Sequence, residues 1–233
     1  MRFSNDRRLC RKESPVQKTA IYDLDGTVIY TPIGYIQRVI SEVVEELGGK
    51  NHITPEKSYR LWLETDRNRI LEEEFEVNPH MFWQAFNKID NPQRARNSSP
   101  YEDVLLLMEL KRQGYKLGVL SGAPRQIVDD EVDLLINRSF GGKNIFDIVA
   151  CTGTGGEFKP KPDSEGLEHC LASLGASKSS SVMVGNGEED VLVGLKAGIR
   201  TMLVLRPDRA LYPYRGVEPH RKVHTLYPLR TMN

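Results

Sequence analysis

The chain has 233 residues, 39% of them hydrophobic and 27% charged, which suits one large α/β domain or a core domain with a smaller insertion. Its 32 basic and 32 acidic residues cancel, so no net field favours a nucleic acid or an anionic membrane as a partner. The cysteines, Cys10, Cys151 and Cys170, are odd in number and widely spaced, which argues against a disulfide framework and predicts a reducing, cytoplasmic compartment. The basic stretch from Arg2 to Lys18 lacks the apolar segment of a secretion signal, and we expect a poorly ordered terminus there.

The first part of the chain reads as one strand followed by helices. Apolar residues recur at helical spacing, and glycines, prolines and capping residues mark the ends. The expected elements are a buried strand over 19–24, a helix over 36–47 that ends at Gly48-Gly49, a helix that opens at Thr54-Pro55 and carries Tyr59, Trp62, Leu63 and Ile70, a short helix after Asn78-Pro79, and a polar linker over 91–100. No clear strand lies between residues 32 and 98, so this region is predicted to be a helical insertion.

The second part of the chain alternates between strands and helices. The expected elements are a helix over 101–113, a strand over 115–120, a helix over 124–137, a strand over 146–150, a loop over 152–162, a helix around 167–174, a strand over 181–185, a helix over 188–197, a strand over 200–205 and a last short strand at 222–225. Such alternation predicts a parallel sheet wrapped by helices. We therefore expect an α/β core over 1–31 and 99–233, with residues 32–98 as a helical cap over the carboxyl edge of the sheet.

Two acids follow the first predicted strand. Asp23 and Asp25 stand one residue apart, so they share a face of the chain, and Gly26 allows the turn after them. Two buried carboxylates repel each other and resist ionisation, so a protein keeps such a pair when a cation or a substrate offsets it. The alternative is a tight turn with both acids solvated, because Asp-Gly is an ordinary turn signal.

Three further polar segments lie where later strands are predicted to end. Ser121-Gly122 offers a hydroxyl and a backbone amide for an anion at a helix N-terminus. The loop over 159–162 offers lysines that could neutralise the anion, and the run over 185–190 offers oxygens for a hard cation. In an open α/β sheet these segments meet beyond the carboxyl ends of the strands, where ligands bind.

In order and spacing, the four segments together resemble the motifs of the haloacid dehalogenase-like hydrolases, over residues 19–205 of this chain. The resemblance is to the phosphoglycolate-phosphatase-like branch. It implies a Rossmann-like three-layer core with a parallel sheet, a helical cap of the family's first type, and hydrolysis of a small phosphorylated metabolite with Mg²⁺ as cofactor. An acid at position 25 is a feature of the family's phosphatases and phosphomutases, whereas its dehalogenases lack one.

The resemblance also implies roles for individual residues. Asp23 would be the nucleophile that forms an aspartyl-phosphate, and Asp25 would protonate the leaving oxygen and then activate water. The residues implied in phosphate binding are Thr27, which would fix the turn, and Ser121, Gly122 and Lys161. The residues implied in binding the metal are Asp23, Asp25 through its backbone carbonyl, Asn186 and Asp190.

Two positions in these motifs are ambiguous or unusual. Both Lys159 and Lys161 precede a proline and fit the third motif; we prefer Lys161 because its spacing to the helix at Leu167 fits the family better. Asn186 stands where the family usually has an aspartate, and an amide oxygen can bind a hard cation but brings no charge. We therefore expect weaker binding of magnesium than in relatives.

Other readings stay open at this point. A phosphomutase would use the same residues, and the asparagine at position 186 also allows a phospholigand-binding protein that has lost turnover. The aromatic residues of the insertion could line a substrate pocket, although aromatic residues at helical spacing more often form a core; these residues are Trp62, Phe82, Trp83 and Phe86. Arg125 could reach a substrate phosphate or cap a surface turn.

Overall fold

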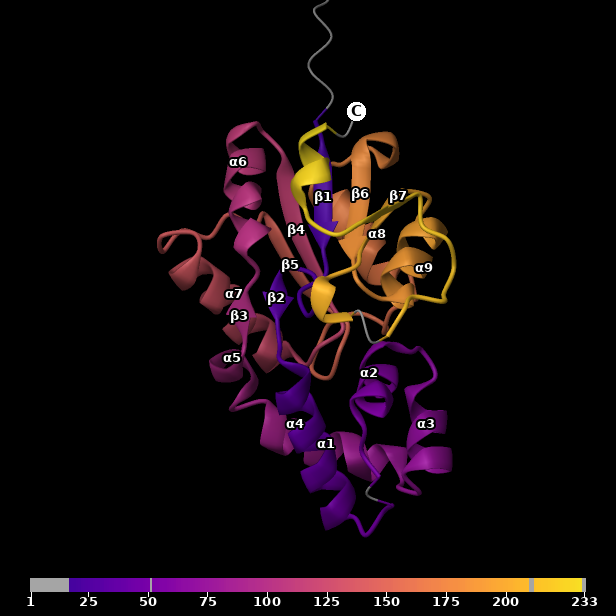
Figure 1. Ribbon diagram of the computed structural model, residues 1–233. Coiled ribbons are helices and arrows are strands. Elements are labelled where there is room, and N and C mark those ends of the chain that lie inside the picture. Colours follow the sequence, from indigo (N-terminus) through magenta and orange to yellow (C-terminus); the bar gives the residue numbers. More distant parts are fainter. Residues whose placement is uncertain (1–16, 51, 210–211, 232–233) are drawn as a thin grey trace, which may run out of the picture.

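The computed structural model describes residues 17–50, 52–209 and 212–231 (Figure 1). Cys10 and the basic N-terminal stretch, except for Lys18, lie outside the described residues. The described residues form a six-stranded sheet with helices on both faces, and α1 to α4 gather beyond the carboxyl end of β1 (Figure 1). In this part of the chain no helix has the length and apolar character needed to cross a bilayer.

The elements follow the predicted order closely. The helices are α1 (Ile33–Glu46), α2 (Pro55–Leu63), α3 (Arg67–Glu74), α4 (Pro79–Asp90), α5 (Arg94–Asn97), α6 (Leu106–Arg112), α7 (Arg125–Arg138), α8 (Glu165–Ser173) and α9 (Glu188–Lys196). The strands are β1 (Thr19–Tyr22), β2 (Ile29–Tyr30), β3 (Ser99–Pro100), β4 (Lys116–Ser121), β5 (Ile148–Cys151), β6 (Ser181–Gly185), β7 (Arg200–Val204) and β8 (Arg221–Val223). Short 3₁₀ turns lie at Glu102–Leu105, Lys178–Ser180, Pro207–Arg209 and Tyr227–Thr231.

The main sheet has the order β5-β4-β1-β6-β7-β8, and neighbouring strands are parallel. Side chains alternate along β1, which separates two apolar layers. Ala20 and Tyr22 face the layer formed with α6, α7 and the C-terminal 3₁₀ turn, whereas Ile21 faces the layer formed with α8 and α9. The predicted α/β fold with a parallel, three-layer core is confirmed.

The helical insertion, which we define as α1 to α5, has a hydrophobic cluster of its own that includes Val39, Phe75 and Phe82. The expected cap at Thr54 is present, since its hydroxyl accepts a hydrogen bond from the Lys57 amide (3.2 Å). The Asn78 side chain caps α4 in the same way by accepting from the Met81 amide (3.1 Å). The helix expected to run from Thr54 to Ile70 is instead two helices, because the exposed polar residues 64–66 let the chain turn between α2 and α3.

The connections between the insertion and the sheet are more ordered than expected. The segment predicted to be a polar linker contains α5 and β3. Strand β3 pairs with β2 in an antiparallel two-stranded ladder, in which Ile29 lies opposite Pro100 and Tyr30 opposite Ser99. The chain therefore leaves the sheet and returns to it at the same place, which lies next to the turn after Asp25.

Candidate active site

The parallel register of the strands brings the four predicted segments to one edge of the sheet. Tyr22 at the end of β1 lies opposite Val119 of β4 and Val184 of β6, so the residues that follow each strand are neighbours. The Asp23 amide continues the ladder by donating to the Val184 carbonyl at 2.9 Å. The expectation that these segments meet beyond the strands therefore agrees with the register.

A buried ion cluster occupies the centre of this edge. The Lys161 Nζ atom lies 2.8 Å from the Asp23 Oδ1 atom and 2.6 Å from the Asp190 Oδ1 atom. The Lys161 side chain is 1% exposed, whereas the Lys159 side chain is 70% exposed and lies 4.0 Å from Glu165. Of the two candidate lysines, only Lys161 contacts Asp23 among the described residues.

The cluster shifts the protonation of its members. Burial raises the pKa of Asp23 to about 8, Lys161 opposes this rise, and Asp190 adds to it. Burial disfavours the Lys161 ammonium, but Asp190 and Asp23 outweigh burial and raise the pKa of Lys161. Lys161 is therefore a fixed positive charge beside a carboxylate that burial makes reluctant to ionise, which is an environment that a further cation would relieve.

Asp25 is held by residues of the connections to the insertion. Its carboxylate accepts a hydrogen bond from the Thr31 hydroxyl (3.1 Å) and forms an ion pair with the Arg94 guanidinium, whose Nη1 atom is 2.9 Å away. Arg94 is buried, also pairs with Asp90, and lies over the Trp62 ring at 4.6 Å from its centre. The position of the Asp25 side chain thus depends on how the insertion packs against the sheet.

Sequence reasoning missed Arg94 and one further residue near Asp25. Arg94 lies in the segment that we expected to be a polar linker, although its spacing of four residues from Asp90 is the pattern of a helical ion pair. Glu131 of α7 is fully buried. Burial raises the pKa of Glu131, and the nearby Asp25 raises it further. The sequence signal for Glu131 is a single acid on the apolar face of the helix predicted over 124–137.

The predicted phosphate-binding residues also lie at this edge. The Thr27 hydroxyl donates to the Asp23 Oδ2 atom at 3.4 Å. The Ser121 hydroxyl is buried and accepts from the Ala123 amide at 3.2 Å. Gly122 lies beside Lys161, since a Cβ atom at position 122 would be 3.6 Å from the Lys161 Cε atom. The Thr27 hydroxyl and the Lys161 ammonium group therefore contact the Asp23 carboxylate, and Gly122 lies beside Lys161. Arg125, which sequence reasoning left undecided, pairs instead with Asp129 and Glu157.

In the fourth segment, hydrogen bonds and an ion pair fix the Asp190 carboxylate, and the Asn186 side chain lies beside the turn at Gly26. The Asp190 Oδ2 atom accepts from the Asn186 amide (3.1 Å) and the Gly187 amide (2.9 Å), while its other oxygen contacts Lys161. The Asn186 side chain lies against Gly26, where φ is +70° and any Cβ atom would clash with it. Gly26 is therefore required for both the turn and the close approach of Asn186.

A divalent cation fits this donor set. The Asp23 carboxylate, the Asp25 backbone carbonyl and the Asn186 amide oxygen are ligand types that Mg²⁺ accepts, and rotation of the amide would present its oxygen to the turn. No cluster of three or more His, Cys, Asp or Glu side chains able to hold a metal is found among the described residues. A cation here would therefore depend on backbone and amide oxygens as well as on Asp23.

A cavity of about 690 Å³ lies over these residues and extends to the insertion. Its wall includes the ion cluster on one side and residues of α2, α3 and α4 on the other. An ion pair crosses it, with the Arg67 Nη2 atom 3.1 Å from the Glu189 Oε2 atom. Burial favours the neutral acid, but Arg67 and Lys161 outweigh it and lower the pKa of Glu189.

The segment after β7 also contacts the site, which sequence reasoning did not foresee. The Arg209 guanidinium donates to the Asn186 carbonyl, and Arg209 is buried. The Tyr59 hydroxyl of α2 donates to the Asp208 carbonyl at 2.6 Å, and the Tyr212 hydroxyl donates to Glu64. This segment therefore connects the helical insertion with the loop that carries Asn186.

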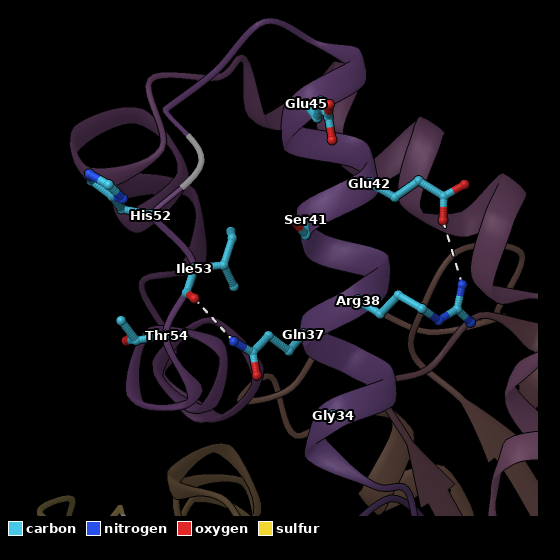
Figure 2. Close-up of a pocket in the computed structure, with 9 residues that line it drawn as sticks. All are labelled: Gly34, Gln37, Arg38, Ser41, Glu42, Glu45, His52, Ile53 and Thr54. Carbon is cyan, nitrogen blue, oxygen red and sulfur yellow. Dashed lines mark hydrogen bonds and ion pairs between the residues drawn. The ribbon is translucent and has the colours of Figure 1, made fainter.

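A second hollow lies on the outer surface of the insertion, between α1 and residues 52–54 (Figure 2). The Gln37 side chain donates to the Ile53 carbonyl at 3.0 Å, and Arg38 pairs with Glu42 at 3.6 Å (Figure 2). It contains none of the predicted site residues, and the charged groups at its wall belong largely to one exposed helix surface.

Several known proteins are similar to this chain. It is 30% identical over 149 residues to pyrophosphatase PpaX of Halalkalibacterium halodurans, covering 64% of this chain and 63% of that protein, which is less than two thirds of its length. It is 28% identical over 200 residues to pyrophosphatase PpaX of Bacillus cereus, covering 80% of this chain and 82% of that protein.

Solved structures share the fold. A structure from Bacteroides fragilis described as a haloacid dehalogenase-like hydrolase has a TM-score of 0.72 at 22% identity, covering 91% of this chain and 99% of that chain. A structure from Lactobacillus plantarum described as a phosphoglycolate phosphatase has a TM-score of 0.74 at 15% identity, covering 92% and 98%. The sequence profile of the haloacid dehalogenase-like hydrolases matches residues 20–204, more than half of the chain. The chain therefore belongs to the haloacid dehalogenase-like hydrolase family.

Proposed function

We propose that this chain is a Mg²⁺-dependent phosphatase that hydrolyses a small phosphate monoester through an aspartyl-phosphate on Asp23. The observation that carries the proposal is the buried Asp23 carboxylate with the Lys161 ammonium 2.8 Å away, both lining a cavity that residues of the insertion also line. The names of relatives support a phosphoryl substrate, since two of them are a pyrophosphatase and a phosphoglycolate phosphatase.

In the first step, an Asp23 oxygen attacks phosphorus and the bond from phosphorus to the leaving oxygen breaks. Asp25 gives its proton to the leaving oxygen. Lys161, the Ser121 hydroxyl and the Gly122 amide hold the phosphoryl oxygens as negative charge is redistributed. Thr27, which donates to Asp23, fixes the orientation of the nucleophile.

In the second step, Asp25 takes a proton from a water molecule, whose oxygen attacks the phosphorus of the aspartyl-phosphate. The bond between phosphorus and Asp23 breaks, which releases phosphate and restores both acids. When bound, Mg²⁺ supplies positive charge that reduces the repulsion between the phosphate and the nucleophile. We propose that Asp23, the Asp25 carbonyl and Asn186 hold it, with Asp190 beside them directly or through water.

We also propose that residues 32–98 form a cap domain and that residues 1–31 and 99–233 form the core domain. The separate hydrophobic cluster of the insertion and the paired strands β2 and β3 at its base support this division. A cytoplasmic location and a small phosphorylated metabolite as partner, rather than a nucleic acid or a membrane, remain predictions of the sequence.

The test is hydrolysis of an aryl phosphate by the full chain, with Mg²⁺ and with a chelator. We expect turnover that requires Mg²⁺, is lost in Asp23→Asn, and persists in the exposed control Lys159→Ala. Tight binding of phosphate compounds without turnover would indicate a phospholigand-binding protein instead. Return of the phosphoryl group to a sugar phosphate, without release of phosphate, would indicate a phosphomutase.

A further inference from the structure

We infer that the group leaving from phosphate is uncharged and carries a planar ring. This inference rests on the proposed phosphatase function and concerns the half of the cavity formed by the insertion. The wall there combines tryptophan rings and amide side chains with cations that are already paired, and these features select the leaving group.

The cations that line the cavity are Arg67, Arg94 and Lys161, and each has a carboxylate partner. Arg67 pairs with Glu189 at 3.1 Å and also donates to the Glu64 carbonyl. Arg94 pairs with Asp25 and Asp90. Lys161 pairs with Asp23 and Asp190 in the core, on the side of the transferred phosphoryl group. The described lining therefore holds no free cation for a second anionic group.

Aromatic side chains form much of the wall on the insertion side. Trp62 and Trp83 are half-buried and line the cavity, and both rings lie close to Phe86, at 6.3 Å and 5.7 Å between ring centres. Phe82, in contrast, is fully buried and does not line the cavity, so the aromatic set divides into core and lining residues. The Trp83 Nε1 atom donates to the Asn68 side chain at 3.1 Å, which fixes that ring.

Neutral polar groups complete this wall. The Asn87 side chain lines the cavity, and no hydrogen bond from its amide group is found among the described residues. The Asn68 amide nitrogen is likewise without a described acceptor, since its oxygen receives the Trp83 bond. Two tryptophan rings and two amide groups in one wall match a flat ring with polar edges, because rings pack on aromatic residues and amides bond to their edges.

The charges exclude the alternative leaving groups. A carboxylate or a second phosphate placed here would meet Asp66, Glu189 and Asp25 with no unpaired cation to offset it, and like charges brought together without a cation partner disfavour binding. The leaving group would thus differ from those of the relatives named a pyrophosphatase and a phosphoglycolate phosphatase.

The experiment compares substrates whose leaving oxygens are similarly basic and differ in the attached group. Benzyl phosphate carries a neutral ring, ethyl phosphate is neutral without a ring, and phosphoglycolate carries a carboxylate. With the full chain and Mg²⁺, we expect kcat/KM for benzyl phosphate to exceed that for ethyl phosphate about tenfold and that for phosphoglycolate about 100-fold. A nucleoside 5′-monophosphate, whose leaving oxygen is also an alkoxide, should behave like benzyl phosphate.

A substitution tests the charge argument directly. Asn87→Lys places a cation without a carboxylate partner on this wall, so kcat/KM for phosphoglycolate should rise about tenfold, whereas the control Gln84→Lys, which adds the same charge on α4 outside the cavity lining, should leave it unchanged. Trp83→Leu should lower kcat/KM for benzyl phosphate by a larger factor than that for ethyl phosphate. Thermal unfolding of each variant checks that the insertion still folds.

The outcomes separate the two proposals. Higher kcat/KM for phosphoglycolate than for benzyl phosphate, in a protein that needs Asp23, would overturn the inference and leave the phosphatase function intact. Equal values for benzyl and ethyl phosphate would overturn the ring requirement. Absence of turnover with every compound, including an aryl phosphate, would overturn the proposed function itself.

Discussion

Replacement of Asn186 by aspartate should tighten magnesium binding. The two side chains have the same shape, so the introduced carboxylate would fit against Gly26 as the native amide does, and the change is one of charge alone. An added carboxylate near a divalent ion gains Coulomb energy of several kcal/mol at the effective dielectric of a partly buried site. Repulsion from Asp23 and desolvation of the new charge offset most of that energy.

The net gain worked from these opposing effects is about 1–3 kcal/mol, which corresponds to about 10- to 100-fold tighter binding. The same substitution should lower stability in a chelator, because a further acid joins Asp23 and Asp190 around the one ammonium group of Lys161. Magnesium should then raise the melting temperature of Asn186→Asp more than that of the native chain.

Calorimetric titration with MgCl₂ and thermal unfolding with and without Mg²⁺ measure both effects. The matched control is Asn137→Asp, which adds the same charge at an exposed position of α7. Unchanged magnesium affinity in Asn186→Asp, or an equal change in the control, would refute the reasoning that the missing charge at this position weakens the metal site.

Three further predictions concern the residues around the site. Arg94→Lys should slow hydrolysis of ethyl phosphate about tenfold or more and that of an aryl phosphate much less, because Arg94 contacts Asp25, the proposed general acid, and an aryl leaving oxygen needs less protonation. Equal losses on both substrates would contradict this role. Lys161→Met should reduce the free energy of unfolding by about 3–5 kcal/mol in urea denaturation, because it leaves buried acids without their cation, while Lys159→Met should change it by less than about 0.5 kcal/mol. For Asp147, burial disfavours the ionised acid, but the hydrogen bonds from Lys111 and the Leu117 amide outweigh burial and lower the pKa. The ionised acid should therefore stabilise the fold by about 1 kcal/mol above its unfolded-state pKa, and this contribution should be lost as pH falls below about 4. The free energies of unfolding of the native protein and of Asp147→Asn should converge in acid, and a difference that persists there would exclude this linkage.

The sequence predicts the core of the fold well because its signals are local and repeated. The central strands β1, β4 and β6 are short, buried and largely apolar runs, and the longer helices α1 and α4 carry an apolar stripe. The confirmed cap at Thr54 shows how a single side chain can mark a helix start, and Asn78 has the same function at α4. The break between α2 and α3 could not be placed because the apolar spacing from Tyr59 to Ile70 also suits one continuous helix.

The candidate site was predictable where its residues belong to short motifs. The spacing of Asp23 and Asp25, and the order of the later segments, point to one edge of the sheet from the sequence alone. The choice of Lys161 over Lys159 as the lysine that lies beside Asp23 depends on the fold, because both lysines precede a proline and only the folded chain determines which is buried.

The partners of the motif residues were not predictable, because they lie far away along the chain. Arg94 follows Asp25 by 69 residues and Arg209 follows Asn186 by 23, and each belongs to a segment without a strong periodic pattern. Such contacts arise only when the insertion and the last segment fold back on the sheet, so no local signal in the sequence reports them.

The contacts of the segment after β7 have a practical consequence for anyone who trims this protein to the boundaries of its family profile. A polypeptide that stops at residue 204 would keep every motif residue but lose Arg209, whose guanidinium donates a hydrogen bond to the backbone carbonyl of Asn186. It would also lose Arg206, whose guanidinium forms an ion pair with buried Asp103 at 2.7 Å. That acid would then be left inside the protein without its counter-charge, and α2 would lose the anchoring of Tyr59 to Asp208. Such a shortened protein should therefore be judged by its folding before any loss of catalysis is ascribed to chemistry.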